Sequence, residues 1–527
     1  MMKSFNDLNP MQRGSLTGKA IYLFLFILTP ILFALSALIK APLVDAFHEG
    51  EYLIAALSMH DYYSGVAAFP VLVHGAMDFI PALIAGRVGG PDHMIAWTRL
   101  LNFVAVGICW VVYMDLGRTV LRNHPQRLAM LGAFVALFFL MTNAADIDPV
   151  HRQQSFLGTR DIFLMLSLWS AIRAAACDRS VAIAGFHVLS GVFAAACLYW
   201  SYDRGLMAGI WLLMLSAGFI YQGKYKSAAT LLLSYAAALF LVSGTGVAGS
   251  LGENLHNIGY WVKSSGDVWY ISFKNKLQAL PGALCLAAFA VLVLIIAAQW
   301  LLKNRSQHNA PYVLGLAVMQ LVFLTKLYSL PLFPTGHYFI WPSIILVIMI
   351  LPEQPWVRTL STQLADFWRP ATGGNKVLLA AFAALALSFF ANPVVFSAMN
   401  VRNAIKIPAD AELIDANRYS LDGLPTQDVS CILLWTNEGA LSVLSKKRAC
   451  TNYPYPVYIS RAQEAAVLEQ LKKNPPGLIV YDSPFWSTKI YGRDMKERLP
   501  AIDQFINDNY VFSENRSGYV FATPKQK

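Results

Sequence analysis

Long apolar blocks separated by short polar connections make up most of the first three quarters of the chain. A helix that crosses a bilayer needs about 20 mostly apolar residues. The pattern predicts about eleven such helices, in chain order Ala20–Ile39, Ile95–Met114, Leu128–Asn143, Ile162–Ala176, Val181–Tyr199, Leu206–Tyr221, Ala228–Gly246, Leu280–Leu302, Pro311–Tyr328, Tyr338–Leu351 and Val377–Phe396. The fold class we expect is therefore a polytopic α-helical membrane protein.

The pattern changes at about residue 401 to one typical of a small soluble domain. Two short apolar runs, bounded by turn residues, read as buried strands, and amphipathic stretches lie between and after them. The expected elements are strands at Val429–Trp435, Leu478–Tyr481 and Gly518–Ala522, and helices at Arg461–Lys473 and Ile502–Asn509. We therefore predict a membrane domain over residues 1–400 and a small α/β or α+β domain over residues 401–527.

Residues 41–94 are too many for a simple connection between two spans. Their apolar pieces are interrupted by Pro70, Gly75 and Pro81, and counting Val71–Ala85 as a span would place the basic run Arg118–Arg127 on the outer side. We expect instead helices that lie along the outer membrane surface. A later outer segment, residues 247–278, is expected to be a loop.

Composition and charge support a membrane protein with a defined orientation. The chain has 527 residues, of which 56% are hydrophobic and 14% charged, and a net charge of +10. The Lys and Arg residues gather in alternate loops, which predicts a cytoplasmic N-terminus and an outer C-terminal domain. The excess of positive charge is thus a topology signal, and no nucleic-acid partner is expected.

Two cysteines lie in the C-terminal part, Cys431 and Cys450. On the outer side of the membrane they face an oxidising compartment, which favours a disulfide. Because Cys431 falls inside a predicted strand, a role as an ordinary core residue stays open.

The richest chemistry in the sequence lies at Asp45–Tyr52, which reads DAFHEGEY directly after the first span. If this stretch is helical, Asp45, His48, Glu49 and Tyr52 share one face, whereas Glu51 points elsewhere. Carboxylates that are crowded in this way suit a general base or a metal site. An acidic, solvated helix start is the alternative.

Further ionisable residues recur in segments expected on the same outer side. They are Asp146, Asp148, Arg160, Asp203, Arg204 and His337, together with Lys326 near the end of a span. Acidic groups can deprotonate a hydroxyl or hold a metal, and cationic groups can bind a phosphate. Glycosyl transfer from a polyprenyl-phosphate sugar needs both, because a base activates the acceptor while the phosphate departs.

The order of these motifs resembles the GT-C superfamily of membrane glycosyltransferases, in particular its bacterial branch that uses polyprenyl-phosphate sugars. Asp45 to Tyr52 is similar to the acidic first-loop motif of that family, and Phe69-Pro70 with His74-Gly75 is similar to the element that follows. Trp97-Thr98-Arg99-Leu100 resembles its Arg-Leu entry to the next span. Gly336-His337-Tyr338 resembles an Arg-Tyr element before a late span, although His337 stands where Arg is usual.

This resemblance implies an inverting glycosyltransferase in the bacterial inner membrane, with its site on the periplasmic face. The implied partners are a polyprenyl-phosphate-linked sugar, membrane lipid and a glycan, lipid or protein acceptor, with a pentose such as arabinofuranose or a hexose as the sugar. No cofactor is certain, and a divalent metal at Asp45, Glu49 and Asp146 stays open. The implied site has Asp45 or Glu49 as base, an acidic and acceptor cluster of His48, Glu51, His74, Asp146 and Asp148, and donor-phosphate ligands Arg160, Arg204, Lys326, His337 and Tyr338.

Three other functions fit parts of the pattern. A transporter or flippase of lipid-linked sugars would need charges along a path through the bilayer. An O-antigen polymerase or ligase would use diphosphate-linked donors. A non-catalytic assembly subunit would tolerate loss of the first-loop carboxylates.

Overall fold

The computed structural model describes residues 44, 48–90, 92–121, 158–268, 273–329, 341–350, 359, 413–414, 429–436, 438–484, 494–515 and 518–525. Before residue 351 it is helical. The elements are α3 (His48–Tyr63), η3 (Ala76–Asp78), α4 (Ile80–Gly89), α5 (Met94–Val120), η4 (Thr159–Asp161), α7 (Ile162–Ala175), α8 (Ser180–Trp200), α9 (Tyr202–Tyr221), α10 (Tyr225–Thr245), α11 (Leu251–Val268), α12 (Phe273–Asn304), α13 (Ala310–Ser329) and α15 (Trp341–Ile350).

Among the described residues, five helices are long and apolar enough to cross a membrane. These are Met94–Val120, Ser180–Trp200, Tyr202–Tyr221, Tyr225–Thr245 and the Ala287–Asn304 part of α12. Each overlaps a predicted block, as do α7, α13 and α15, with ends that differ by up to seven residues. The predicted spans at 20–39, 128–143 and 377–396 lie outside the described residues, so the total of about eleven stays a prediction.

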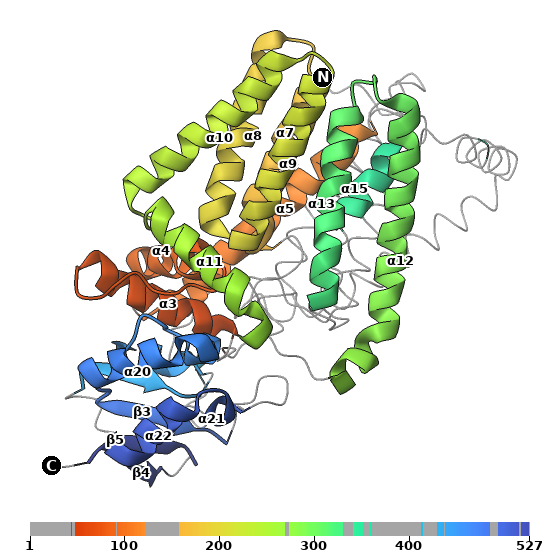
Figure 1. The fold of residues 1–527 in the computed structure, drawn as a ribbon. Coiled ribbons are helices and arrows are strands. Elements are labelled where there is room, and N and C mark those ends of the chain that lie inside the picture. Colours follow the sequence, from red (N-terminus) through yellow and green to blue (C-terminus); the bar gives the residue numbers. More distant parts are fainter. Residues whose placement is uncertain are drawn as a thin grey trace, which may run out of the picture.

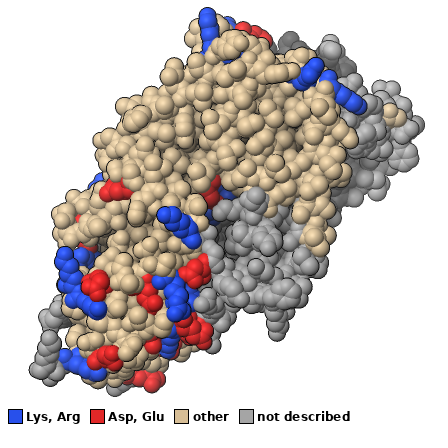
Figure 2. Space-filling model, viewed as in Figure 1, with Lys and Arg blue, Asp and Glu red and all other residues tan. Residues whose placement is uncertain are grey.

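The outer faces of these helices are apolar. Val181, Leu233, Phe240, Leu241 and Leu302 are each more than two thirds exposed. In a soluble protein such a surface would be unfavourable, whereas lipid tails are a suitable environment for it. Figure 2 shows few charged side chains over the helices and many over the opposite, C-terminal part of the molecule.

The basic connections α9–α10 and α12–α13 lie together at one end of the helices. The Lys224 Nζ is 3.0 Å from His308 Nδ1, and Gln222 Nε2 donates to the Gln307 carbonyl oxygen at 2.7 Å. The first-loop helices α3 and α4 lie toward the other end, between the spans and the C-terminal sheet (Figure 1). These two basic connections therefore lie at the end of the helices away from α3 and α4, and the orientation in the membrane stays a prediction.

The described residues between 429 and 525, here called the C-terminal sheet unit, contain a five-stranded mixed sheet in the order β2-β1-β3-β5-β4. The strands β2, β1 and β3 are parallel, and β5 and β4 are antiparallel to their neighbours. Its elements are β1 (Cys431–Leu434), α19 (Ala440–Ser445), β2 (Arg448–Ala449), η7 (Pro456–Tyr458), η8 (Arg461–Gln463), α20 (Glu464–Lys473), β3 (Leu478–Asp482), α21 (Met495–Arg498), α22 (Pro500–Asn509), β4 (Tyr510–Glu514) and β5 (Val520–Pro524). All five elements predicted from the sequence here are confirmed, and so is the Cys431–Cys450 disulfide.

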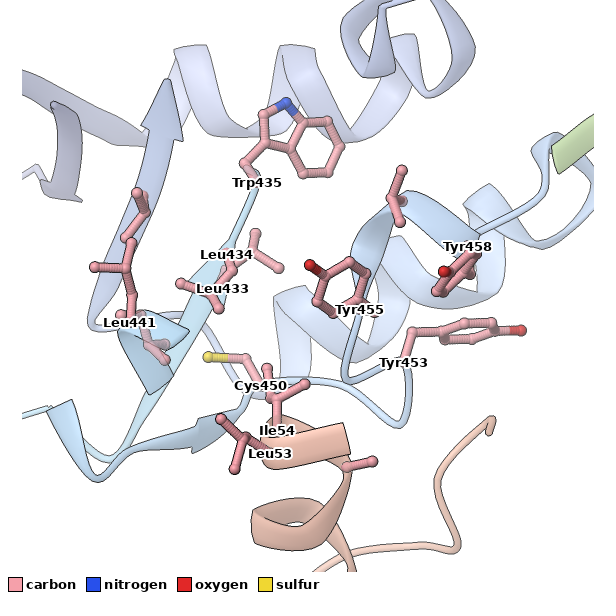
Figure 3. Close-up of a cluster of buried hydrophobic side chains, with 14 of the residues drawn as sticks. Leu53, Ile54, Leu433, Leu434, Trp435, Leu441, Cys450, Tyr453, Tyr455 and Tyr458 are labelled. Carbon is pink, nitrogen blue, oxygen red and sulfur yellow. The ribbon is translucent and has the colours of Figure 1, made fainter. Parts of the chain in front are cut away.

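The hydrophobic core of the sheet unit continues into the first-loop helix α3. Leu53 and Ile54 of α3 are fully buried in the same cluster as Leu433 of β1 and Cys450. Figure 3 shows the two α3 side chains pointing toward Cys450 and the strand. Because apolar area is removed from water on both sides, this contact stabilises the attachment of the sheet unit to α3.

The expectation of a loop at residues 247–278 is wrong for its central part, which forms α11. Its buried side contains Asn254, Asn257 and Tyr260, which recur at helical spacing. Their polar atoms bond to neighbouring segments; for example, the Asn257 Nδ2 donates to the Pro70 carbonyl oxygen at 3.2 Å. The helix is stabilised by these tertiary contacts, whereas its low hydropathy resembles that of a loop.

Two glycines make a close backbone contact between α3 and the sheet unit. A Cβ atom on Gly439 would lie 2.8 Å from Gly50 Cα, and a Cβ on Gly50 would lie 2.8 Å from Gly439 Cα. Real Cβ atoms essentially never come so near to backbone atoms. Either side chain would force the two backbones apart.

We expect Gly439→Ala to destabilise the folded protein by about 1–3 kcal/mol, because the added methyl group overpacks this contact. Gly439 has φ −57°, so alanine causes no backbone strain by itself. The measurement is the thermal unfolding transition of the detergent-solubilised protein. Gly185→Ala on α8 is the matched control, because its Cβ would meet no atom within 4 Å. Equal transitions for the two variants would contradict the close contact.

Candidate active site

Glu49 lies in the first turn of α3 and is fully buried. Arg99 of α5 binds the Glu49 carboxylate in a bidentate manner: Nε donates to Oε1 at 2.6 Å and Nη2 donates to Oε2 at 2.7 Å. The Tyr52 hydroxyl donates to Oε1 at 3.2 Å, which confirms that Glu49 and Tyr52 share one helix face. A paired, bidentate geometry is the arrangement in which a buried carboxylate is best stabilised.

Glu51 lies on a different side of α3, as predicted, but that side faces the protein interior and not water. Its Oε1 is 3.6 Å from His74 Nδ1, and its Oε2 accepts a 3.2 Å hydrogen bond from the Tyr458 hydroxyl. His74 Nδ1 is in turn 2.8 Å from Asp78 Oδ1. The side chains of Glu51, His74 and Asp78 are all buried, so the first-loop acidic cluster extends to Asp78.

The turn that contains His74 is held against the α8–α9 corner. Gly75 has φ +126°, and a Cβ there would lie 2.9 Å from the Trp200 carbonyl oxygen, so glycine is required. The Tyr202 backbone N–H donates to the His74 carbonyl oxygen at 2.6 Å. The acidic cluster and the first residues of α9 are therefore direct neighbours.

A second charged cluster lies at this start of α9. Arg160 donates to both oxygens of Asp203, from Nη2 at 2.7 Å and from Nε at 3.2 Å. Arg204 Nε donates to Asp161 at 2.5 Å and its Nη1 donates to Asp203 at 3.1 Å. The Arg204 side chain is 1% exposed and that of Arg160 is 17% exposed. Arg160 is thus the more accessible of the two cations.

The helix α13 brings a further predicted residue toward the same cluster. The Arg204 guanidinium lies 5.3 Å from the ring centre of Phe323. Lys326 follows Phe323 by three residues on the same helix, which is about one turn. The backbone position of Lys326 is therefore one turn beyond a residue in contact with Arg204.

The structure unites part of the predicted site. Glu49, Glu51 and His74 belong to the acidic cluster, and Arg160 and Arg204 belong to the neighbouring one. Of His48 and Lys326 only the helical backbone is described. Asp45, Asp146, Asp148, His337 and Tyr338 lie outside the described residues, and their roles stay predictions.

Glu51, His74 and Asp78 could hold a metal ion, because one ligand atom from each lies within 4.8 Å of the others. Imidazole and carboxylate ligands suit several divalent cations. This trio differs from the set expected from the sequence, in which Glu49 was a candidate ligand beside Asp45 and Asp146. Both Glu49 oxygens already accept bonds from Arg99.

Four site residues were not assigned a role from the sequence. They are Arg99, Asp78, Asp161 and Tyr458. Arg99 lies inside a motif that resembles the family's Arg-Leu element, which was a usable signal. Tyr458 lies 407 positions from Glu51, and only the tertiary fold brings the two together.

The helices, their apolar outer faces and the buried charges at one end define a multi-pass helical membrane protein. No family model and no curated protein matches the chain. Among solved structures it is similar to the crystal structure of ArnT from Cupriavidus metallidurans bound to undecaprenyl phosphate, with a TM-score of 0.47 and 14% identity over 95% of this chain and 97% of that chain.

We expect Arg99→Met to destabilise the protein by about 3–5 kcal/mol, because it leaves the buried Glu49 carboxylate without its cation. The measurement is the thermal transition and the yield of monodisperse protein. Arg173→Met is the control, since Arg173 is 37% exposed in its pair with Asp115 and should cost less than about 1 kcal/mol. Comparable losses in both variants would contradict a special role of the Glu49–Arg99 pair.

Proposed function

We propose that this chain is an inverting glycosyltransferase of the GT-C type. It moves a sugar from a polyprenyl-phosphate donor to a glycan, lipid or protein acceptor on the periplasmic face of a bacterial inner membrane. A pentose such as arabinofuranose is one candidate sugar. The supporting observation is the meeting of buried carboxylates and arginines, from segments far apart in the sequence, at the end of the helices opposite the basic connections.

The two clusters supply the two halves of the proposed reaction. A carboxylate of the first-loop segment takes the proton from the acceptor hydroxyl as that oxygen attacks the anomeric carbon. The bond from that carbon to the donor phosphate oxygen breaks on the opposite face, which inverts the configuration. The phosphate leaves as polyprenyl phosphate, and its negative charge is stabilised by nearby cations.

The roles can be divided according to burial and pairing. Glu49, held at both oxygens by Arg99, is suited to position the start of α3, and we therefore propose Asp45, four positions earlier in the sequence, as the base. Arg160, whose side chain is more exposed than that of Arg204, is proposed as a phosphate ligand. Arg204 is proposed to hold Asp161 and Asp203 in place, and Lys326 is proposed as a second phosphate ligand.

The purified protein should consume one member of a panel of polyprenyl-phosphate sugars and release polyprenyl phosphate. Asp45→Asn should slow this release by about 100-fold or more, because a general base contributes roughly 10²–10⁴ in rate. Glu469→Gln, a change at an exposed carboxylate of α20, should leave the rate unchanged. Movement of intact lipid-linked sugar across vesicles without bond cleavage would instead identify a flippase, and consumption of diphosphate-linked donors alone would identify a polymerase or ligase.

Arg160→Ala should raise the KM for the donor by about tenfold or more, since a hydrogen bond to a charged group contributes about 1.5–3 kcal/mol. Its thermal transition should stay close to that of the unmodified protein. Arg461→Ala, at an exposed arginine of the sheet unit, is the control and should leave the KM unchanged. An unaltered donor KM in Arg160→Ala would remove Arg160 from the phosphate site.

A further inference from the structure

The C-terminal sheet unit contributes one polar side chain directly to the acidic cluster. The Tyr458 hydroxyl donates to Glu51 Oε2 at 3.2 Å, across 407 positions of sequence. The opposite oxygen of Glu51 faces His74 Nδ1 at 3.6 Å. Glu51 is therefore held between a tyrosine from the sheet unit and a histidine from the first loop.

The backbone around Tyr458 is fixed from two other elements. The buried Arg498 of α21 donates Nη1 to the Val457 carbonyl oxygen at 3.0 Å and Nη2 to the Ile459 carbonyl oxygen at 2.9 Å. The Tyr260 hydroxyl of α11 donates to the Tyr458 carbonyl oxygen at 2.5 Å. The backbone carbonyl oxygens of Val457, Tyr458 and Ile459 thus all accept hydrogen bonds. These bonds restrict rotation of the backbone around Tyr458.

The ring of Tyr458 is also held in place. Its centre lies 5.6 Å from that of Trp261 and 5.6 Å from that of Tyr455. Burial, followed by the negative charge of Glu51, raises the pKa of Tyr458 well above its ordinary value. The hydroxyl therefore keeps its proton over the physiological range and acts as a donor.

The segment that leads to Tyr458 is anchored at its start as well. The Cys431–Cys450 disulfide ties it to β1, and the Val71 backbone N–H donates to the Asn452 carbonyl oxygen at 2.7 Å. These anchors and Arg498 hold the backbone on both sides of Tyr458. Such rigid support is what a positioning contact needs.

We infer that Tyr458 is a positioning residue for Glu51, and that the sheet unit completes the active site by holding this carboxylate in its working orientation. The inference rests on the proposed glycosyl transfer, because Glu51 belongs to the acidic cluster of that reaction. It assigns the sheet unit a part in the chemical step, beyond any contact that it makes with the acceptor.

The test is Tyr458→Phe, which removes the hydroxyl and keeps the ring. With the donor that the unmodified protein consumes, we expect kcat to fall about tenfold and the KM values for donor and acceptor to stay within about twofold, because the Tyr458 hydroxyl orients Glu51 within the acidic cluster and does not itself bind substrate. Tyr481→Phe is the matched control: it removes a Tyr-to-carboxylate bond of 2.7 Å, to Asp503, elsewhere in the same unit.

A second comparison separates positioning from general stability. In a Glu51→Gln background, Tyr458→Phe should change kcat much less than it does alone, because the hydroxyl acts through that carboxylate. If Tyr458→Phe is poorly folded, Tyr260→Phe serves instead; it frees the Tyr458 carbonyl and should lower kcat about threefold with KM unchanged.

An unchanged kcat in Tyr458→Phe would overturn the inference, and so would an equal loss of kcat in Tyr481→Phe. The inference would also fail if Tyr458→Phe lowered kcat by the same factor in the Glu51→Gln background as in the unmodified protein. If Tyr260→Phe is the variant used, an unchanged kcat has the same meaning. By contrast, failure of the unmodified protein to consume any donor would overturn the proposed function itself.

Discussion

Burying negative charge is the constraint on which the rest of this structure depends. Glu49, Glu51 and Asp78 are each less than 5% exposed. An ionised carboxylate that leaves water loses several kcal/mol of hydration unless charges and hydrogen bonds replace it. The replacements come from different parts of the chain: Arg99 from α5, His74 from the first loop and Tyr458 from the sheet unit. Satisfying these groups fixes where α3 lies relative to all three.

The same requirement links the acidic cluster to the arginines at the start of α9. Asp161 and Asp203 are also largely buried, and each accepts a bond from Arg204. The backbone bond from Tyr202 to His74 joins the two clusters with no intervening side chain. The His74 turn and the first residues of α9 are therefore held directly against each other.

The helical part of the fold was predictable because hydrophobic length is a local property. The starts of α7, α8 and α13 fall within one residue of the predicted ones. α11 was missed because its residues are of mixed polarity and it is helical through contacts such as those of Asn257 with Pro70 and Tyr202. In the sheet unit, β2 has only two residues and β4 has a mostly exposed pattern, so neither produced a hydrophobic run.

The candidate site was predictable in residue type but not in pairing. Crowded carboxylates at the start of α3 were visible in the sequence, and the helical spacing correctly placed Tyr52 beside Glu49. It could not show that Arg99 occupies both oxygens of Glu49, or that Glu51 faces a histidine and a tyrosine. Such partners depend on how the helices and the sheet are arranged in space. The periodicity of a single sequence shows which residues share a face of one element, but not which residues of other elements they meet.

Apolar packing holds the sheet unit against α3 more firmly than a single polar contact could. The Tyr458–Glu51 bond is one interaction, and its geometry would be loose if the unit moved by an ångström. The Gly50–Gly439 contact and the shared core of Leu53, Ile54 and Cys450 prevent such movement, because close-packed apolar groups resist small displacements. Glycine at both contact positions lets the two backbones meet, and the apolar core keeps them together. The buried carboxylate is thus oriented by a hydrogen bond whose precision comes from the hydrophobic interface next to it.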